Sequence, residues 1–276
     1  MSFLEYEGIE VIDTVSTNDK SLLTTVIGIK SNDGIVLASD SQISSGDLKN
    51  LEGTKLFRIN DYVALGCAGD IAEAQMFIEE LSIRLTNELL DRKQLRKLVE
   101  AVLLQFYKEY AVDWSKKLKL GSIVNFYNPV SLLSARLPQN KFGLYVLKFS
   151  PKPSMAEVPI FEAIGSGDKL ANLMLRQYSR GLQGMTNKRF SDLPINLGVV
   201  FSTLTINEIK GLDRDSGGNT KVIKVDYNGV TYVTDDDLLD LYNKFIDFMS
   251  SGYNQMSGGK VNIEAIRTIF PPMSRS

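Results

Sequence analysis

The sequence predicts an α+β fold in which helices cover a pair of mainly antiparallel sheets. Strand patterns open the chain, two long helical patterns follow, and strands, helices and strands then return in blocks. Elements that come in blocks, rather than in strict strand–helix alternation, are typical of antiparallel sheets with helices on their outer faces. With no internal repeat or low-complexity segment, we expect one domain over residues 24–250, preceded by an N-terminal extension (1–23) and followed by a C-terminal tail (251–276).

The first element is a hairpin over residues 24–40. Two runs rich in β-branched residues flank a Ser-Asn-Asp-Gly turn, where the glycine supplies the positive φ that a tight turn needs. The second run, residues 35–38, is almost wholly apolar, which predicts an inner strand covered on both sides. Antiparallel pairing about this turn places Asp40, at the end of the hairpin, near Thr24 at its start.

Two strands and two helices are expected next. A turn at 44–47 precedes strands at 55–59 and 62–67. Apolar residues then recur at three- and four-residue steps, which predicts a helix that Asp70 can cap and a second helix over about 93–117.

The second half of the chain repeats this order. Strand patterns return over 123–149, with a turn at 138–141, and a further strand is expected over 158–164. Helices are predicted over 169–180 and 193–209. A last hairpin pairs 222–225 with 230–233 about Asn228-Gly229, and an acidic amphipathic helix covers 235–249.

Composition excludes several classes of function. The 276 residues include 31 basic and 33 acidic side chains, a net charge of −2, which gives no electrostatic case for binding nucleic acid or an anionic membrane. No apolar run approaches the roughly 20 residues of a membrane span, and the acidic N-terminus is not a signal peptide. We therefore expect a cytoplasmic protein.

The absence of histidine constrains the chemistry most. With no histidine and one cysteine, Cys67, the chain cannot use a Ser-His-Asp or Cys-His mechanism, and it has no ligands for a zinc site of histidines or thiolates. No metal or cofactor is expected. If the protein is an enzyme, its base is a carboxylate, a lysine, a tyrosine or a terminal amine.

Five short motifs carry the candidate chemistry: Thr24-Thr25, Ser39-Asp40, Lys55, Gly165-Ser166-Gly167 and Asp213-Arg-Asp-Ser216-Gly217. Each is weak alone, because an Asp near a Lys is more often a structural ion pair than a catalytic set. Gly-Ser-Gly before a helix is also found at anion sites, so a module that binds a small anion stays open as an alternative.

In this order and at these spacings, the motifs resemble the β-type subunits of the proteasome, which belong to the N-terminal nucleophile hydrolases. The resemblance extends over about residues 24–226 and includes the run Ala68-Gly69-Asp70-Ile71-Ala72-Glu73-Ala74-Gln75. It implies a four-layer αββα sandwich and a threonine-type endopeptidase that degrades unfolded proteins within a ring complex.

The resemblance also implies a role for particular residues. Thr24 matches the N-terminal nucleophile, Asp40 and Lys55 the pair that orients and polarises it, and Gly69 the donor to the oxyanion. Ser166, Asp213 and Ser216 match the shell around the terminal amine. The expected substrate contacts are the backbone at Ser44 and an apolar side-chain pocket formed by Ile43, Gly53, Cys67 and Ile71, which favours cleavage after hydrophobic residues.

The implied mechanism suits a chain without histidine. An α-amino group has a pKa of about 8 and can accept a proton at neutral pH, where a lysine with a pKa of about 10 cannot. Once residues 1–23 are removed, the amine of Thr24 lies next to its own hydroxyl and can act as its base, directly or through a water molecule.

One residue departs from the family pattern. Members that cut themselves usually have glycine before the threonine, whereas this chain has Leu23. The alternative is therefore an unprocessed structural subunit of the same ring. In either case the resemblance implies as partners other β-type and α-type subunits in stacked rings and a regulatory ATPase, with no role for nucleic acid or membranes.

Overall fold

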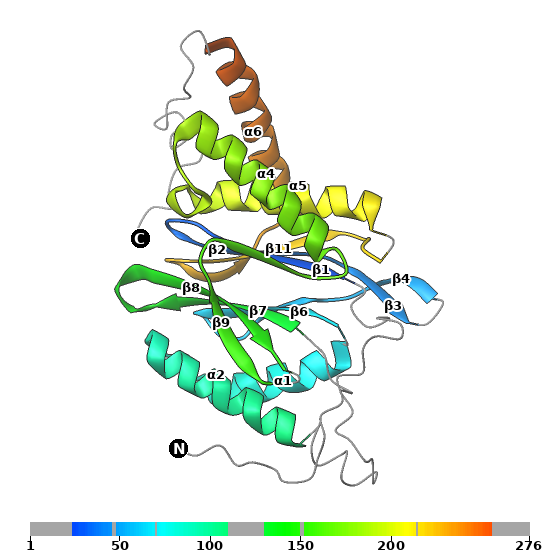
Figure 1. Ribbon diagram of the computed structural model, residues 1–276, viewed down its shortest axis with the longest axis vertical. Helices are drawn as coiled ribbons and strands as arrows, with labels where there is room; N and C mark the ends of the chain where they lie inside the picture. The colour runs from blue at the N-terminus through cyan, green and yellow to red at the C-terminus, as the bar shows by residue number, and fades with distance from the viewer. Residues whose placement is uncertain are drawn as a thin grey trace.

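The computed structural model describes residues 24–45, 48–69, 71–109, 130–149, 152–213 and 215–255. Two five-stranded antiparallel sheets lie face to face, and helices cover both outer faces (Figure 1). The predicted αββα sandwich is confirmed. The expected extension (1–23), Asp70, residues 110–117 of the second predicted helix and the tail beyond residue 255 lie outside the described residues.

The first sheet has the strand order β10-β1-β2-β11-β12. Its strands are β1 (Thr25–Lys30), β2 (Gly34–Asp40), β10 (Phe161–Gly165), β11 (Thr220–Asp226) and β12 (Gly229–Tyr232). The predicted hairpin is confirmed, with Ile27 paired to Ala38. All seven residues of β2 are buried, as expected for a strand covered on both sides.

The second sheet has the order β5-β6-β7-β8-β9. Its strands are β5 (Leu56–Arg58), β6 (Val63–Ala68), β7 (Val130–Leu137), β8 (Lys141–Lys148) and β9 (Ser154–Val158). The turn predicted at 138–141 is confirmed as the short η2 helix (Pro138–Asn140) between β7 and β8.

Two predictions about strands were incomplete or wrong. Residues on both sides of the expected turn at 44–47 form a separate hairpin of β3 (Gln42–Ser45) and β4 (Leu48–Glu52), whose polar sequence gave no strand pattern. The single strand expected over 158–164 is in fact two strands in different sheets: β9 ends at Val158 and β10 begins at Phe161. Pro159 lies between them, and proline has no N–H to continue a strand ladder.

Within the part of the chain that the structure describes, five α-helices lie outside the two sheets. The helices α1 (Ile71–Arg84) and α2 (Arg92–Tyr107) cover the second sheet, and α4 (Asp168–Thr186) and α5 (Ile195–Leu212) lie over the first (Figure 1). The helix α6 (Asp235–Gln255) packs against α5 and projects away from the sandwich (Figure 1). The carboxylate of Asp91 caps α2 by accepting bonds from two backbone N–H groups of its first turn. Within the described residues, no helix has the length and apolar content needed to cross a bilayer.

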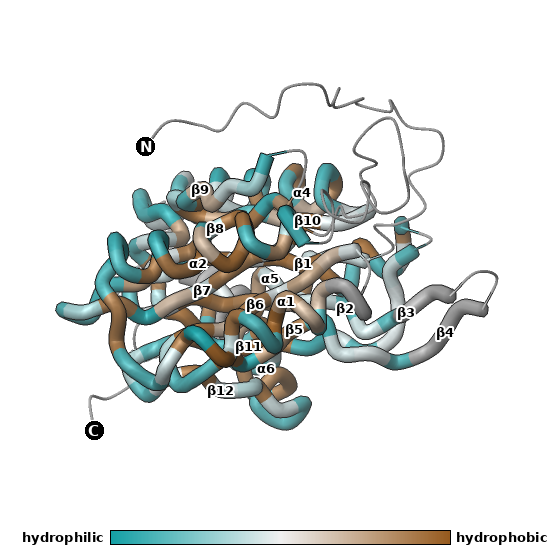
Figure 2. Tube along the Cα trace, turned by 90° about the horizontal axis from the view of Figure 1, so that it is seen from below, coloured by the Kyte–Doolittle hydropathy of each residue, from teal (hydrophilic) through white to brown (hydrophobic). Residues whose placement is uncertain are grey.

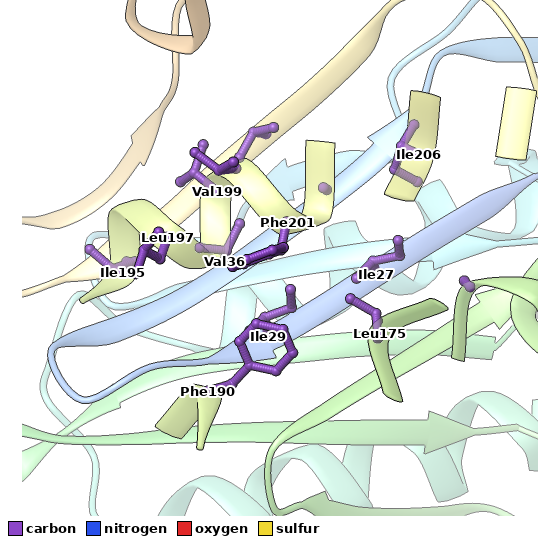
Figure 3. Close-up of a cluster of buried hydrophobic side chains, with 14 of the residues drawn as sticks. Ile27, Ile29, Val36, Leu175, Phe190, Ile195, Leu197, Val199, Phe201 and Ile206 are labelled. Atoms are coloured by element: carbon purple, nitrogen blue, oxygen red, sulfur yellow. The ribbon is translucent and has the colours of Figure 1, made fainter. Parts of the chain in front are cut away.

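Three apolar clusters hold the layers together, and hydrophobic residues concentrate on the inner strands (Figure 2). Alternation along β1 sends Val26 between the two sheets and Ile27 and Ile29 toward the helices. Figure 3 shows the helix-side cluster, where Ile27 and Ile29 lie opposite Leu175 of α4 and side chains of α5. Since β1 is fixed on both faces, the position of its first residues is fixed as well.

Candidate active site

Thr24, Asp40 and Lys55 meet where the two sheets come together. Thr24 directly precedes β1, Asp40 ends β2, and Lys55 directly precedes β5 of the other sheet. The Oδ1 atom of Asp40 accepts bonds from Thr24 Oγ1 at 2.8 Å and from Lys55 Nζ at 2.9 Å. The hairpin prediction that Asp40 lies near Thr24 is thus confirmed, and Lys55 joins the same carboxylate oxygen.

The carboxylate of Asp40 is fully enclosed by donors. Its Oδ1 also accepts from the backbone N–H of Thr25 at 3.0 Å, and its Oδ2 accepts from the N–H groups of Gly217 at 3.0 Å and Gln42 at 3.3 Å. The side chain of Asp40 is 0% exposed and that of Lys55 is 2% exposed. A buried carboxylate needs such partners, because an unpaired buried charge is costly.

Burial and the neighbouring carboxylate of Asp40 shift the pKa of Lys55 in opposite directions. Loss of solvent around the ammonium lowers the pKa of Lys55 below its usual value, and the nearby Asp40 offsets part of that decrease. The carboxylate of Asp40 therefore helps the buried Lys55 side chain to keep its proton.

A second polar group holds the backbone of Thr24 and the side chain of Thr25. The carbonyl oxygen of Thr24 accepts from Ser166 N at 2.7 Å, and Ser166 Oγ lies 3.3 Å from the same oxygen. Asp213, which directly follows α5, accepts at Oδ2 from Ser166 Oγ at 2.6 Å and from Ser216 Oγ at 2.8 Å. The hydroxyl groups of Ser216 and Thr25 lie 2.9 Å apart. Ser166 thus contacts the carbonyl of Thr24, while Asp213 and Ser216 reach it through Ser166 and Thr25. Their predicted role around the terminal amine stays a prediction.

Gly165 allows this close approach. Its φ of +103° lies in the left-handed region, and a Cβ at this position would come 1.9 Å from the carbonyl oxygen of Thr24. In β10, Gly165 pairs with Thr25. A residue without a side chain is therefore required here for the N–H of Ser166 to reach Thr24.

The predicted oxyanion donor and substrate contacts lie around the same end of the sandwich. Gly69, with a φ of +112°, directly follows β6, and the N–H of Cys67 in that strand donates to the carbonyl of Lys55 at 2.9 Å. Ser44 lies at an irregularity in the β3–β4 pairing, and the N–H of Gly53 donates to Ser41 O at 2.9 Å.

The side chains that were expected to form the substrate pocket are described only in part. Those of Ile43, Ser44 and Ile71 are outside the description. Cys67 is 3% exposed and packs in the cluster beneath α1 and α2, where Ser131 Oγ lies 3.4 Å from its sulfur. Burial raises the pKa of the Cys67 thiol to about 12, so this thiol is not a nucleophile. The apolar substrate pocket stays a prediction.

Four contributors were not assigned from the sequence: the hydroxyl and the backbone N–H of Thr25, and the N–H groups of Gln42 and Gly217. Backbone donors leave no trace in residue types, although Gly217 lies in a motif that we singled out. The N–H of Ser166 is occupied by Thr24 O, which weakens the alternative of an anion site at the Gly-Ser-Gly turn. Within the described ranges, no group of three or more Asp, Glu, His or Cys residues is placed to hold a metal ion.

Comparison with known proteins decides the family. The sequence profile of the family described as "Proteasome subunit" matches residues 23–193. The chain belongs to the proteasome subunit family. Proteasome subunits assemble with one another in rings, and this chain is a subunit of such a ring.

Relatives indicate the type of proteasome subunit. Proteasome subunit beta of Nanoarchaeum equitans is 30% identical over 54% of this chain and 70% of its own length. The beta subunits of Methanococcus aeolicus and Methanocaldococcus fervens are each 25% identical over 80% of this chain, and over 92% and 89% of their own lengths. The resemblance inferred from the motifs is thus confirmed: this proteasome subunit is of the β type.

Proposed function

We propose that this subunit is a threonine-type endopeptidase whose nucleophile, Thr24, becomes N-terminal when residues 1–23 are removed. The observation that carries the proposal is the buried set Thr24 Oγ1, Asp40 Oδ1 and Lys55 Nζ, joined at 2.8 and 2.9 Å across the two sheets. A subunit that only builds a ring gains little from a buried ion pair, which is weak support for stability. The same pair beside a hydroxyl is useful in catalysis.

The proposed reaction begins with the free amine of Thr24. The Thr24 hydroxyl, which donates to Asp40 in the structure, transfers its proton to this amine. Its Oγ1 then attacks the carbonyl carbon of the substrate. The resulting oxyanion collapses, the peptide C–N bond breaks, and the leaving amine takes the proton, so that an ester remains on Thr24. Water then attacks the ester with the amine again as proton acceptor, which frees the threonine.

Two other groups stabilise charge in this reaction. The Lys55 ammonium contacts the same Asp40 oxygen as the Thr24 hydroxyl and so favours negative charge on Oγ1 as it loses its proton. We assign the N–H of Gly69 to the oxyanion, where the loss of one donor typically costs about 3–4 kcal/mol of transition-state stabilisation.

The same proposal covers substrate and partners. We expect unfolded polypeptides to be cut after hydrophobic residues, in a cytoplasmic complex of β-type and α-type rings fed by a regulatory ATPase. Hydrolysis of a Leu-Leu-Val-Tyr reporter peptide, compared with acidic and basic reporters, tests the preference. Faster hydrolysis of either charged reporter would contradict an apolar pocket.

A second candidate function rests on Leu23. Family members that cut themselves usually have glycine at this position, so its replacement favours a subunit that stays unprocessed and has only an architectural role.

An epoxyketone inhibitor separates the two candidates. Its ketone and epoxide react with the hydroxyl and the free α-amine of one N-terminal threonine, so the adduct requires both groups. We expect the assembled protein to gain one adduct that peptide mapping places on Thr24. A Thr24→Ala variant, as the control, should gain none. An assembled wild-type protein that stays unlabelled would favour the architectural role.

A further inference from the structure

Lys210 lies in the last turn of α5 and has no role in the reaction proposed above. Its Nζ donates to Thr220 Oγ1 at 2.5 Å and to Asn207 Oδ1 at 3.3 Å, and Thr220 Oγ1 donates to Asn207 Oδ1 at 2.7 Å. These side chains form a closed triangle of hydrogen bonds. The triangle joins the end of α5 to the start of β11.

Thr220 brings this triangle next to the candidate site. In the pairing of β11 with β2, Thr220 lies directly opposite Asp40. Such partners send their side chains to the same face of the sheet, with Cβ atoms about 4.5–5.5 Å apart. Two residues earlier and later on these strands, Ala38 and Val222 pack in the helix-side cluster, and α5 lies over both strands (Figure 1). Lys210 therefore holds the side chain that neighbours Asp40 beneath α5.

The triangle also closes the loop that carries a donor to Asp40. In the loop between α5 and β11, Gly217 N donates to Asp40 Oδ2 at 3.0 Å, and Asn219 N donates to Ser41 Oγ at 2.8 Å. Lys210 and Thr220 lie just before and just after this loop. Their hydrogen bond therefore fixes both ends of the segment that binds the Asp40 carboxylate.

Lys210 also brings a second positive charge toward Asp40. Burial lowers the pKa of Lys210 below its usual value, and the carboxylate of Asp40 offsets part of that decrease. The same two causes act on the pKa of Lys55, for which Asp213 is a further source of negative charge. Lys55 approaches from the start of β5 in the second sheet, whereas Lys210 belongs to the helix layer over the first. Two lysines from different layers thus act on one carboxylate.

We propose that Lys210 is a positioning residue of this site, which holds Thr220 beside Asp40 and, together with Lys55, counters the charge of that carboxylate. The proposal rests on the peptidase function proposed above and adds to it a residue that acts through Asp40. In that reaction negative charge grows on Thr24 Oγ1, which donates to Asp40 Oδ1 at 2.8 Å. A fixed and compensated carboxylate opposes this charge less, so Lys210 acts on the chemical step.

Lys210→Met tests the proposal, because it removes the charge and the hydrogen bonds but keeps a long apolar side chain. Hydrolysis of the Leu-Leu-Val-Tyr reporter by the assembled protein gives kcat, KM and their pH dependence. We express kcat per Thr24 that the epoxyketone labels, which removes any loss of folded or assembled protein from the comparison. Lys188→Met, an equal change of charge at an exposed residue beyond the end of α4, is the matched control.

In Lys210→Met, kcat should fall at least about fivefold while KM changes less than about twofold, because Lys210 supports the transition state and not substrate binding. The alkaline decline of kcat, assigned to Lys55, should move to higher pH by about 0.3 unit or more, since losing a like charge raises the pKa of Lys55. Lys188→Met should behave as the wild type.

Two further variants separate charge from hydrogen bonding. Lys210→Arg keeps the charge and the N–H donors and should regain most of the lost kcat. Thr220→Val removes the hydroxyl that accepts from Lys210 and should lower kcat as well. Because both changes break one contact, the double variant Lys210→Met/Thr220→Val should lose less kcat than the product of the two single losses.

The possible failures are distinguishable. An active wild type whose Lys210→Met variant keeps its kcat per labelled site and its alkaline decline would overturn the role of Lys210 and leave the peptidase proposal intact. A loss that Lys210→Arg does not regain would overturn the role of the charge. A wild type that neither reacts with the epoxyketone nor cuts the reporter would contradict the peptidase proposal itself, and this one with it.

Discussion

Asp40 connects every part of the candidate site. Its two carboxylate oxygens accept bonds from the hydroxyl of Thr24, the ammonium of Lys55 and three backbone N–H groups. Removing one member of a buried pair leaves the other charge without compensation, which typically costs about 3–5 kcal/mol. The Asp40–Lys55 pair is thus expected to affect both the stability of the fold and the chemistry of the site.

A double-mutant cycle separates these two roles. Lys55→Met should lower the free energy of unfolding by about 3–5 kcal/mol, because Asp40 is left buried and unpaired. The second single variant is Asp40→Asn. The double variant Asp40→Asn/Lys55→Met should lose about 1–3 kcal/mol less unfolding free energy than the two single variants lose in sum. Urea denaturation of the unassembled chain gives these values, and peptide hydrolysis should be lost in all three variants.

The matched control is Lys244→Met on α6, where the lysine pairs with Asp240 at 2.7 Å but is 48% exposed. It should change stability by less than about 1 kcal/mol. Additive losses in the cycle, or full activity without Lys55, would contradict the role given to the pair.

The lowered pKa of Lys55 predicts the alkaline limit of activity. As pH rises through this pKa, the ammonium that stabilises charge on Thr24 Oγ1 is lost and kcat falls. Because burial puts this pKa below the ordinary lysine value of 10.5, the fall should begin below that pH. Lys55→Arg keeps its charge at high pH, so the pH profile of any residual activity should lack the alkaline decline. A wild-type kcat that stays level to pH 10.5 would disagree.

Residue types predicted the charged part of the site but not its backbone part. The hairpin pattern was enough to bring Asp40 near Thr24, because antiparallel pairing fixes which ends meet. Lys55 belongs to another sheet, and only the family resemblance connected it with Asp40. The N–H groups of Gln42 and Gly217 could not be found, since every residue except proline carries such a group.

At the scale of elements, the contact between β1 and β10 sets the position of the nucleophile. Thr25 pairs with Gly165, and the next N–H along the chain, from Ser166, holds the carbonyl of Thr24. Gly165 is also the point where the sheet leads into α4. A change at Gly165 should therefore act on Thr24 directly.

Gly165→Ala should remove most of the activity and destabilise the protein by about 3 kcal/mol or more. A methyl group would overlap the Thr24 carbonyl, and the φ of +103° is strained for alanine. Gly181→Ala is the control, because nothing lies within 4 Å of a Cβ at this position in α4, and alanine favours a helix. Thermal denaturation and reporter hydrolysis measure both effects. Equal behaviour of the two variants would refute the positioning role of Gly165.

Periodic elements were predicted well, whereas strands without a clear pattern were not. The hairpin at the start, the amphipathic helix α6 and the last hairpin have clear apolar periods and were confirmed. The hairpin of β3 and β4 is polar, so alternation gave no signal. The break at Pro159 separates strands of two sheets, and local sequence does not say which sheet a strand joins.

At the scale of the whole molecule, the removal of residues 1–23 decides between an active and an architectural subunit. Leu23→Gly should speed the removal of these residues during assembly, because family members that cut themselves usually have glycine before the threonine. Leu22→Gly, one position earlier, is the matched control and should process at the wild-type rate. Gel electrophoresis over time follows the conversion. Equal rates for wild type and both variants would show that Leu23 is no obstacle.

Intact-mass spectrometry of the purified, assembled protein tests most directly whether Thr24 becomes the nucleophile. We expect a species whose mass corresponds to a chain that begins at Thr24, and we expect it to disappear in the Thr24→Ala variant. A wild-type protein that keeps its full-length mass throughout assembly would contradict the peptidase function and leave only the architectural one.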